Sequence, residues 1–193
     1  MFDWLSFLTY AVITAVTPCP NNIMSMANGT CKGFVASLPF NFGILFGFSL
    51  VMLICTFFCE VLASLIPSLI RPLQIIGGLY LVWLSWQIYQ SGSDLAQSMQ
   101  SDSFWSGAIL QFVNVKIYIY CILSMQTYIL PIYHGEARAL IGFALLLAFI
   151  GFGFTLLWSA FGAIFSILFS RYSKFVNTVL AIALLYCTYT IFA

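Results

Sequence analysis

The sequence predicts an all-α integral membrane protein with six transmembrane helices, and composition and chain length are the observations that predict it. Of 193 residues, 63% are hydrophobic and 6% are charged, and the mean hydropathy is +1.06. Soluble domains carry about 25% charged residues, so this chain lacks the polar surface that water solubility requires. Backbone groups in lipid must bond within their own segment, and the apolar runs lack the alternation of barrel strands, so helices follow. The net charge of +1 excludes a nucleic-acid partner.

Predominantly apolar runs bounded by charges or turn residues define the six spans. In chain order they cover residues 4–28, 36–66, 72–90, 105–131, 139–168 and 175–192. Six spans of about 20 residues fit the chain as a single membrane domain, residues 1–193. The second and fifth runs exceed the length needed to cross, which predicts tilt or ends among the headgroups. No Lys or Arg precedes the first run, so we expect it to be retained rather than cleaved as a signal peptide.

A polar stretch at about residues 91–103 reads as a linker between two halves of three helices, about 1–92 and 104–193. Residues 83–89 of the third span resemble residues 186–192 of the sixth, as an internal repeat would. Aromatic belts at helix ends are the alternative explanation. If the repeat holds, an odd number of helices per half puts the halves in opposite orientations, so we predict two inverted three-helix repeats.

Orientation is encoded by few charges. Lys32, Arg171 and Lys174 belong to connections on one side, and Arg71 and Arg138 to connections on the other. Cytoplasmic connections carry the excess of Lys and Arg, so three basic residues against two predict that the side with Lys32, Arg171 and Lys174 is cytoplasmic. Both termini are then predicted to be periplasmic.

A motif with two prolines lies well inside the first span. It reads Thr17-Pro18-Cys19-Pro20-Asn21-Asn22. Neither proline donates a backbone hydrogen bond, so the carbonyls of Thr14 and Val16 lose their usual partners and the helix must break. Pro20 is suited to restart it, which leaves the N–H groups of residues 21–23 unpaired at the positive end of a helix dipole. Such an end attracts a carboxylate, and the freed carbonyls and Asn side chains accept from an ammonium group, so the motif favours a zwitterion site. A proline kink that only shapes the bundle is the alternative.

A second polar motif lies at a similar place in the other half. It reads Gln111-Phe112-Val113-Asn114-Val115-Lys116. A charge at the bilayer centre costs about 2.5–3.5 kcal/mol, so Lys116 either serves function or snorkels to the headgroups. Gln111 and Asn114 share one helical face, whereas Lys116 points about 200° from Asn114 in a regular helix. All of them reach one cavity only if the backbone opens between them.

Glu60 is a candidate proton carrier, with an interfacial carboxylate as the alternative. Cys55 and Cys59 precede it, but no second Cys/His pair accompanies them, so we expect neither a metal site nor a cofactor. The sequence contains no catalytic constellation, so we do not expect an enzyme.

Two further features concern helix packing. Gly43 and Gly47 form a G-x-x-x-G motif, which predicts close backbone approach to another helix. Asn41, Gln74, Gln87 and Asn177 are expected to bond between helices rather than to bind a ligand.

The two polar motifs resemble those of a known family. Residues 17–22 resemble the T-P-G-P-N stretch in the first helix of the LysE/RhtB amino-acid exporters, and Asn114-Val115-Lys116 resembles their N-P-K. Residues 111–117 and 180–192 look most like the cysteine/O-acetylserine exporter subgroup. The resemblance implies a multi-pass bacterial inner-membrane protein that exports small neutral amino acids by exchange for protons. Its implied partners are the substrate, the lipid bilayer, protons and a second copy of the chain in a homodimer.

Two positions depart from the family pattern. Cys19 stands where the family usually has Gly, and Val115 stands where many members have Pro. A cysteine between prolines also resembles related membrane thiol-disulfide electron carriers, for which Cys121 is the nearest partner in the second half. That relay is the alternative function.

We therefore predict a substrate site near the midplane, between the broken first helix and the fourth. Its predicted residues are Thr17, Pro18, Cys19, Pro20, Asn21, Asn22, Gln111, Asn114 and Lys116.

Overall fold

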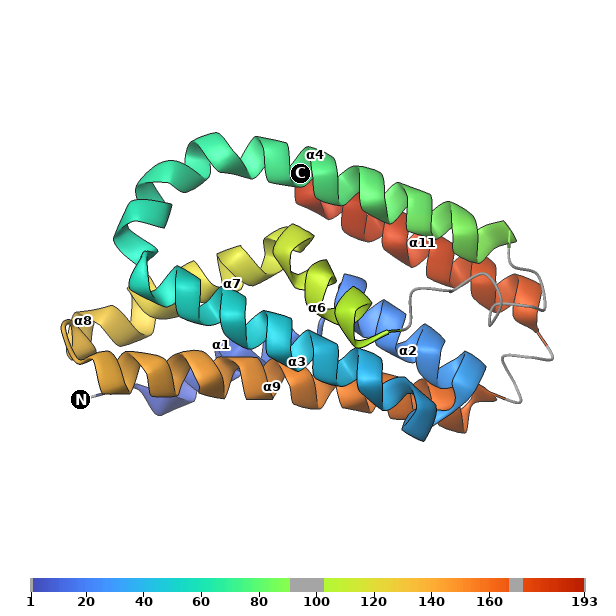
Figure 1. The fold of residues 1–193 in the computed structure, drawn as a ribbon, viewed down its shortest axis with the longest axis horizontal. Helices are drawn as coiled ribbons and strands as arrows, with labels where there is room; N and C mark the ends of the chain where they lie inside the picture. The colour runs from blue at the N-terminus through green and yellow to red at the C-terminus, as the bar shows by residue number, and fades with distance from the viewer. Residues whose placement is uncertain (1, 91–102, 167–171, 193) are drawn as a thin grey trace.

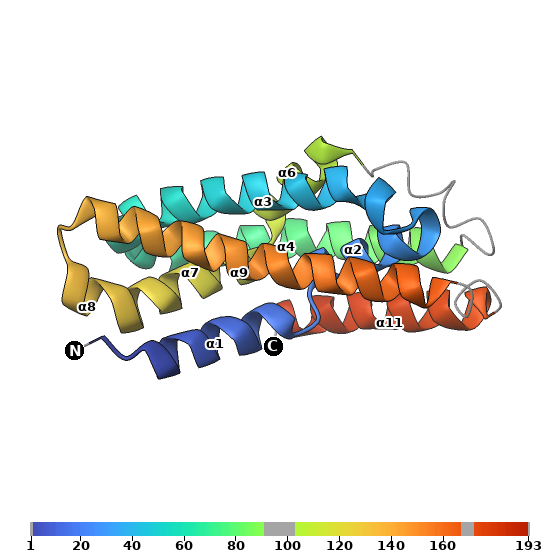
Figure 2. The same ribbon diagram turned by 90° about the horizontal axis from the view of Figure 1, so that it is seen from below.

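The computed structural model of the chain is an elongated bundle of helices (Figures 1 and 2). It describes residues 2–90, 103–166 and 172–192, and those ranges contain no strand. The side chains at 60–70, 73, 84, 87, 173 and 190–192 lie outside the description. The predicted linker at 91–103 also falls outside it, except for Ser103, which caps the next helix.

The first half consists of four helices. They are α1 (Trp4–Val16), α2 (Pro20–Lys32), α3 (Phe34–Phe57) and α4 (Cys59–Gln90). Gly33 joins α2 to α3 with a φ of 81°, a left-handed conformation that favours glycine. We call the end of the bundle at this turn the Lys32 end.

The second half again begins with an interrupted helix. Its elements are α6 (Phe104–Val113), α7 (Val115–Ser124), the π-helical turn η1 (Met125–Ile129), α8 (Leu130–Tyr133), α9 (Ala137–Ile164) and α11 (Ser173–Phe192). α7, η1 and α8 continue one another, and Gly135, with a φ of 84°, turns the chain into α9.

The predicted boundary between the second and third spans is wrong. The chain turns at Phe58 rather than between residues 66 and 72, and α4 continues through Pro67 and Pro72. The predicted boundary rests on the turn and charged residues between positions 66 and 72, but membrane helices tolerate proline where neighbouring groups bond the freed carbonyls. Figure 1 shows α4 following a curved path over the bundle. Glu60, the candidate proton carrier, is the second residue of α4, and its side chain lies outside the description.

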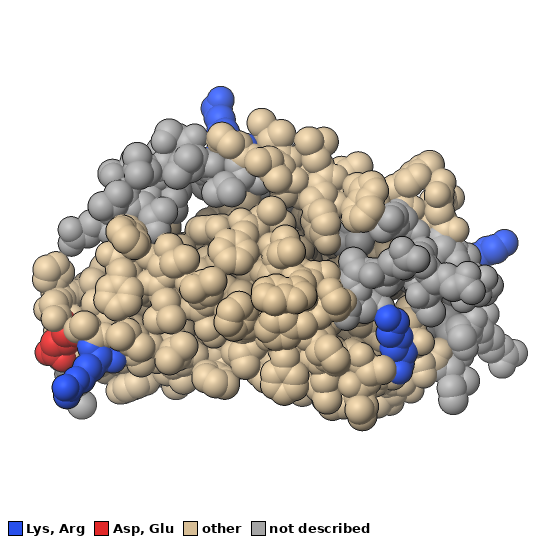
Figure 3. Space-filling model, viewed as in Figure 1, with Lys and Arg blue, Asp and Glu red and all other residues tan. Residues whose placement is uncertain are grey.

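Three of the described segments are long and apolar enough to cross a membrane. They are α3, the continuous run Val115–Tyr133, and α9. The shorter apolar helices are α1, α6 and residues 174–189 of α11. Leu5, Val35 and Ile164 are each more than 70% exposed, as lipid-facing side chains are. In Figure 3, the charged side chains in view lie at the margins of a broad uncharged face.

Glycines set the close packing around the centre. A methyl group on Gly43 or Gly47 of α3 would overlap a backbone carbonyl of α6, so the predicted close approach is confirmed. Gly29 of α2 and Gly162 of α9 bring those two helices equally close. Helices α4 and α11 pack side by side (Figure 1). This packing positions the interruption between α1 and α2 beside that between α6 and α7.

Candidate functional site

The first interruption lies where the two prolines predict it. Helix α1 ends at Val16, and α2 restarts with Pro20 in its first turn. Cys19 is the N-cap residue, with φ −152° and ψ 168°, and no side-chain hydrogen bond caps the helix. Because this conformation is extended, it does not require the glycine that the family motif has here.

Side chains of the chain itself bond the carbonyls freed by the break. The Thr17 hydroxyl donates to the Thr14 carbonyl at 2.8 Å. Asn22 Nδ2 donates to the carbonyls of Ala15 and Thr17, at 2.9 and 3.0 Å. Of the two carbonyls that we predict to accept from a ligand's ammonium group, the Thr14 carbonyl is therefore already hydrogen-bonded, which weakens that prediction.

The amides at the start of α2 follow the prediction in part. The prediction that the Ile23 N–H is unpaired is wrong, because it donates to the Cys19 carbonyl at 3.0 Å. Asn21 and Asn22 lie in the first turn, where a backbone N–H has no acceptor within the helix. The positive end of α2 thus presents two N–H groups.

The second interruption falls at Asn114. Its φ of −85° and ψ of 92° separate α6 from α7, and its Oδ1 accepts the Lys116 N–H at 3.2 Å, which caps α7. The backbone therefore opens where a regular helix would have kept Lys116 on another face. Lys116 Nζ donates to the hydroxyl and carbonyl of Thr17, at 2.7 and 3.2 Å. An ammonium group at the C-terminal end of α1 also interacts favourably with that helix dipole.

A buried amide cluster joins the two interruptions. We define it as Asn21, Gln111 and Asn114, which are all at most 4% exposed. Asn21 Nδ2 donates to Gln111 Oε1 at 2.8 Å, and Asn21 Oδ1 accepts from Gln111 Nε2 and Asn114 Nδ2, each at 3.2 Å. Gln111 Nε2 also donates to the Gly107 carbonyl at 2.7 Å. Residues 90 or more positions apart thus hold the two halves together.

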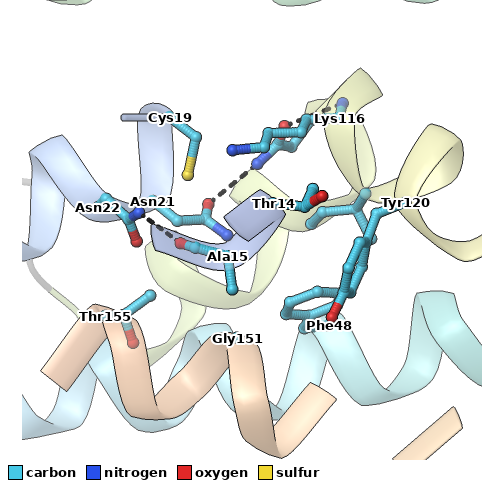
Figure 4. Close-up of a pocket in the computed structure, with 12 residues that line it drawn as sticks. Thr14, Ala15, Cys19, Asn21, Asn22, Phe48, Lys116, Tyr120, Gly151 and Thr155 are labelled. Atoms are coloured by element: carbon cyan, nitrogen blue, oxygen red, sulfur yellow. Dashed lines mark hydrogen bonds between the residues drawn. The ribbon is translucent and has the colours of Figure 1, made fainter. Parts of the chain in front are cut away.

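A cavity lies between these elements (Figure 4). Its lining comprises Thr14, Ala15, Cys19, Asn21, Asn22, Phe48, Asn114, Lys116, Ile117, Tyr120, Gly151 and Thr155. One pole is polar and contains the start of α2 and Lys116. The other is aromatic, where Phe48 and Tyr120 lie with ring centroids 6.1 Å apart. The Tyr120 side chain is 3% exposed, and its hydroxyl has no hydrogen-bond partner among the described residues.

The predicted site residues divide between the cavity wall and its support. Cys19, Asn21, Asn22, Asn114 and Lys116 line the cavity, whereas Thr17, Pro18, Pro20 and Gln111 are not part of its lining. Gln111 anchors Asn21, Thr17 holds the Lys116 ammonium group, and the two prolines break the helix.

Sequence reasoning missed the aromatic pole. The sequence could have indicated Tyr120, because Tyr120 lies one turn after Lys116 on the same face of α7. Phe48 and Gly151 carried no signal, because an apolar residue in a membrane helix looks alike whether it faces lipid, core or cavity.

Cys19 and Cys121 do not form the pair that the predicted thiol relay needs. All six are free, and Cys19 lines the cavity. Cys121 lies instead against α3, with Sγ 3.8 Å from the Met52 carbonyl and 3.9 Å from the Thr56 hydroxyl. The cysteine that approaches the first break is Cys187, whose Sγ is 3.9 Å from the Pro18 carbonyl.

Comparison with known proteins gives one family. Residues 12–191 match the family model described as "LysE type translocator". Relatives named cysteine/O-acetylserine efflux protein from Escherichia coli O139:H28 and Escherichia coli K12 are each 38% identical over 192 residues. A relative of the same name from Shigella flexneri serotype 5b has the same identity, and each alignment covers 97% of this chain and 96% of the relative. No solved structure matches the chain.

Proposed function

The chain belongs to the LysE type translocators, and we propose that it exports cysteine and O-acetylserine across the bacterial inner membrane in exchange for protons. The observation that carries the proposal is the cavity where the two interrupted helices meet. Its polar pole supplies the positive charge that a substrate carboxylate needs, and its aromatic pole fits a small uncharged side chain.

The substrate carboxylate binds at the start of α2. The N–H groups of Asn21 and Asn22 lie at the positive end of that helix, and the N-cap residue Cys19 leaves them uncapped. The start of α7 is less suitable, because Asn114 Oδ1 already accepts one of its N–H groups. Lys116, which lines the same cavity, adds a positive charge to this pole.

The substrate ammonium group binds to the Thr155 hydroxyl. That hydroxyl donates its own hydrogen to the Phe152 carbonyl at 2.8 Å, so toward the cavity it acts only as an acceptor. Thr155 is 2% exposed, and its place on α9 puts it across the cavity from the cation on α7.

The substrate side chain lies at the aromatic pole. A methyl group on Gly151 would overlap the Phe48 ring, so glycine at this position lets the ring occupy the cavity wall. The unpartnered Tyr120 hydroxyl then bonds the ester carbonyl of O-acetylserine or the thiol of cysteine. This arrangement gives a polar contact to either substrate without a charged group.

The two halves act as inverted repeats that rock against each other around this cavity. Three observations support this. Each half begins with a helix that is interrupted in its middle, the two interruptions meet in the amide cluster, and close glycine contacts join α2 to α9 and α3 to α6, across the halves. With Lys32, Arg171 and Lys174 on the cytoplasmic side, both termini lie in the periplasm.

Transport by purified protein in proteoliposomes with an imposed pH gradient tests the proposal. We expect uptake or efflux of cysteine and O-acetylserine that collapses with the gradient. Asn21→Ala and Lys116→Ala reduce it strongly, whereas Lys174→Ala, which removes an exposed lysine at the start of α11, leaves it unchanged. Undiminished transport by Asn21→Ala and Lys116→Ala contradicts the proposed substrate site. Transport that does not depend on the pH gradient contradicts exchange for protons.

Two further variants test the substrate and the alternative function. Tyr120→Phe removes only a hydroxyl. It should lower the transport rate of O-acetylserine more than that of the amino acid alanine, whose side chain lacks a group for Tyr120 to bond. Cys19→Ser should keep transport, whereas a thiol relay would lose its activity altogether.

A further inference from the structure

We propose that the substrate passes between the cavity and the Lys32 end along a polar passage that is collapsed in this structure. We define the polar passage as Ser25 and Asn28 of α2, Ser37 and Asn41 of α3, and Ser159 of α9. Its ligand is the small zwitterion with its hydration water, so this inference rests on the proposed function.

Unpartnered polar atoms first indicate the passage. Asn28 is 1% exposed and Ser25 is 0% exposed. Within the described part of the chain, Asn28 Oδ1 and Nδ2 and Ser25 Oγ have no hydrogen-bond partner, and neither does Asn41 Oδ1. Leaving a buried polar group unbonded costs about 1–3 kcal/mol, so these groups need a state in which water or a ligand bonds them.

On α2, the polar residues continue directly from the site. Asn21, Ser25 and Asn28 are spaced i, i+4 and i+7, which places them along one side of the helix. With a rise of 1.5 Å per residue, Asn28 lies about 10 Å beyond Asn21 toward Lys32. Asn21, which lines the cavity, is therefore the first residue of a polar stripe that continues through Ser25 and Asn28.

Helices α3 and α9 carry matching stripes. On α3, Asn41 and Ser37 follow Phe48 of the cavity at i−7 and i−11. On α9, Ser159 follows Thr155 of the cavity by one turn. The hydroxyls of Ser37 and Ser159 meet at 2.6 Å, so the α3 and α9 stripes converge on the Lys32 side of the cavity.

Backbone packing closes the passage. A methyl group on Gly29 would overlap the Ser159 carbonyl, and one on Gly162 would overlap the Met26 carbonyl. The same holds between α3 and α6, where Gly107 meets the Phe40 carbonyl. Glycine faces can separate without withdrawing interlocked side chains, and separation would expose the unpartnered amides and hydroxyls to water.

The first experiment uses Asn28→Leu in the intact chain. Leucine keeps the branched shape of asparagine but removes its unpartnered polar atoms, so the thermal denaturation midpoint in detergent should stay or rise. Export in proteoliposomes should fall at least tenfold, because the passage loses a group that hydrates the substrate. Met24→Leu, an apolar change on the same buried helix, is the matched control and should keep export. A midpoint that falls together with export indicates a structural asparagine and overturns the proposal, as does undiminished export.

The second experiment reads the passage without relying on export. In a background whose six cysteines are replaced, Ser25→Cys and Ala27→Cys place thiols at neighbouring buried positions of α2. A small methanethiosulfonate reagent applied from the Lys32 side should modify residue 25 and spare residue 27. Equal modification of both, or of neither, overturns the passage. If the wild-type protein exports no amino acid while residue 25 alone reacts, the proposed function fails and the passage stands.

Discussion

The amide cluster is the contact most directly open to a quantitative test. Asn21→Ala removes two reciprocal bonds with Gln111, at 2.8 and 3.2 Å, and a third bond with Asn114 at 3.2 Å. Side-chain hydrogen bonds within membrane proteins contribute about 0.6 kcal/mol each, and at most about 1.7. The two bonds of the Asn21–Gln111 pair should therefore give a coupling free energy of about 1.2 kcal/mol.

A double-mutant cycle measures this coupling. The free energy of unfolding is determined for the wild type, Asn21→Ala, Gln111→Ala and the double variant, and the departure from additivity is the coupling. Asn41→Ala combined with Gln111→Ala is the control, because Asn41 Nδ2 donates to the Ser37 carbonyl and takes no part in the cluster. Additive effects at Asn21 and Gln111, within about 0.3 kcal/mol, would refute the view that the cluster ties the two interruptions together.

Three other changes test the packing and the break. Gly29→Ala places a methyl against a backbone carbonyl of α9, so export and the denaturation midpoint should both fall, whereas Gly153→Ala, which faces open space on α9, should change neither. Thr17→Val removes the hydroxyl that accepts from Lys116 Nζ at 2.7 Å. The transport KM should rise about twofold to threefold, less than for a buried hydrogen bond to a charged group because this contact is exposed, and an unchanged KM would show that the hydroxyl does not orient the Lys116 ammonium group. The double variant P18A/P20A allows the helix to run on, so a loss of export with an unchanged or higher midpoint is expected, and continued export would show that the break is dispensable.

The sequence predicts backbone interruptions better than it predicts their partners. Pro20 forces a restart because proline cannot donate within a helix, and the structure confirms that restart. Asn114 opens α6 without any proline, because asparagine caps a helix well, but the same residue also fits a continuous polar face. The hydrogen-bond acceptors of Asn22 depend on which carbonyls the helix break leaves close to its side chain. Only the folded backbone shows which carbonyls these are.

Not every proline in the chain ends a helix, and this made the predicted end of the second span wrong. The sequence predicts that the second span ends at residue 66, yet α4 continues through Pro67 and Pro72. The composition of a span does not reveal whether the carbonyls that proline frees will find another donor in the assembled bundle. The sequence could not predict the aromatic pole either. Phe48 belongs to α3, which carries apolar residues on every side, so composition does not show which of them faces the cavity.

The two helix restarts differ in their caps, and this difference makes a prediction about Cys19. Asn114 caps α7 with its own side chain, whereas Cys19, in an extended conformation that asparagine also adopts, leaves α2 uncapped. In Cys19→Asn, the new side chain would accept from the N–H groups that we assign to the substrate carboxylate. A capping asparagine contributes about 1 kcal/mol, so the denaturation midpoint should rise while the transport KM rises with it. Cys19→Ala offers no acceptor and should leave the KM unchanged. A Cys19→Asn variant that gains stability and keeps its KM would show that the start of α2 does not bind the substrate.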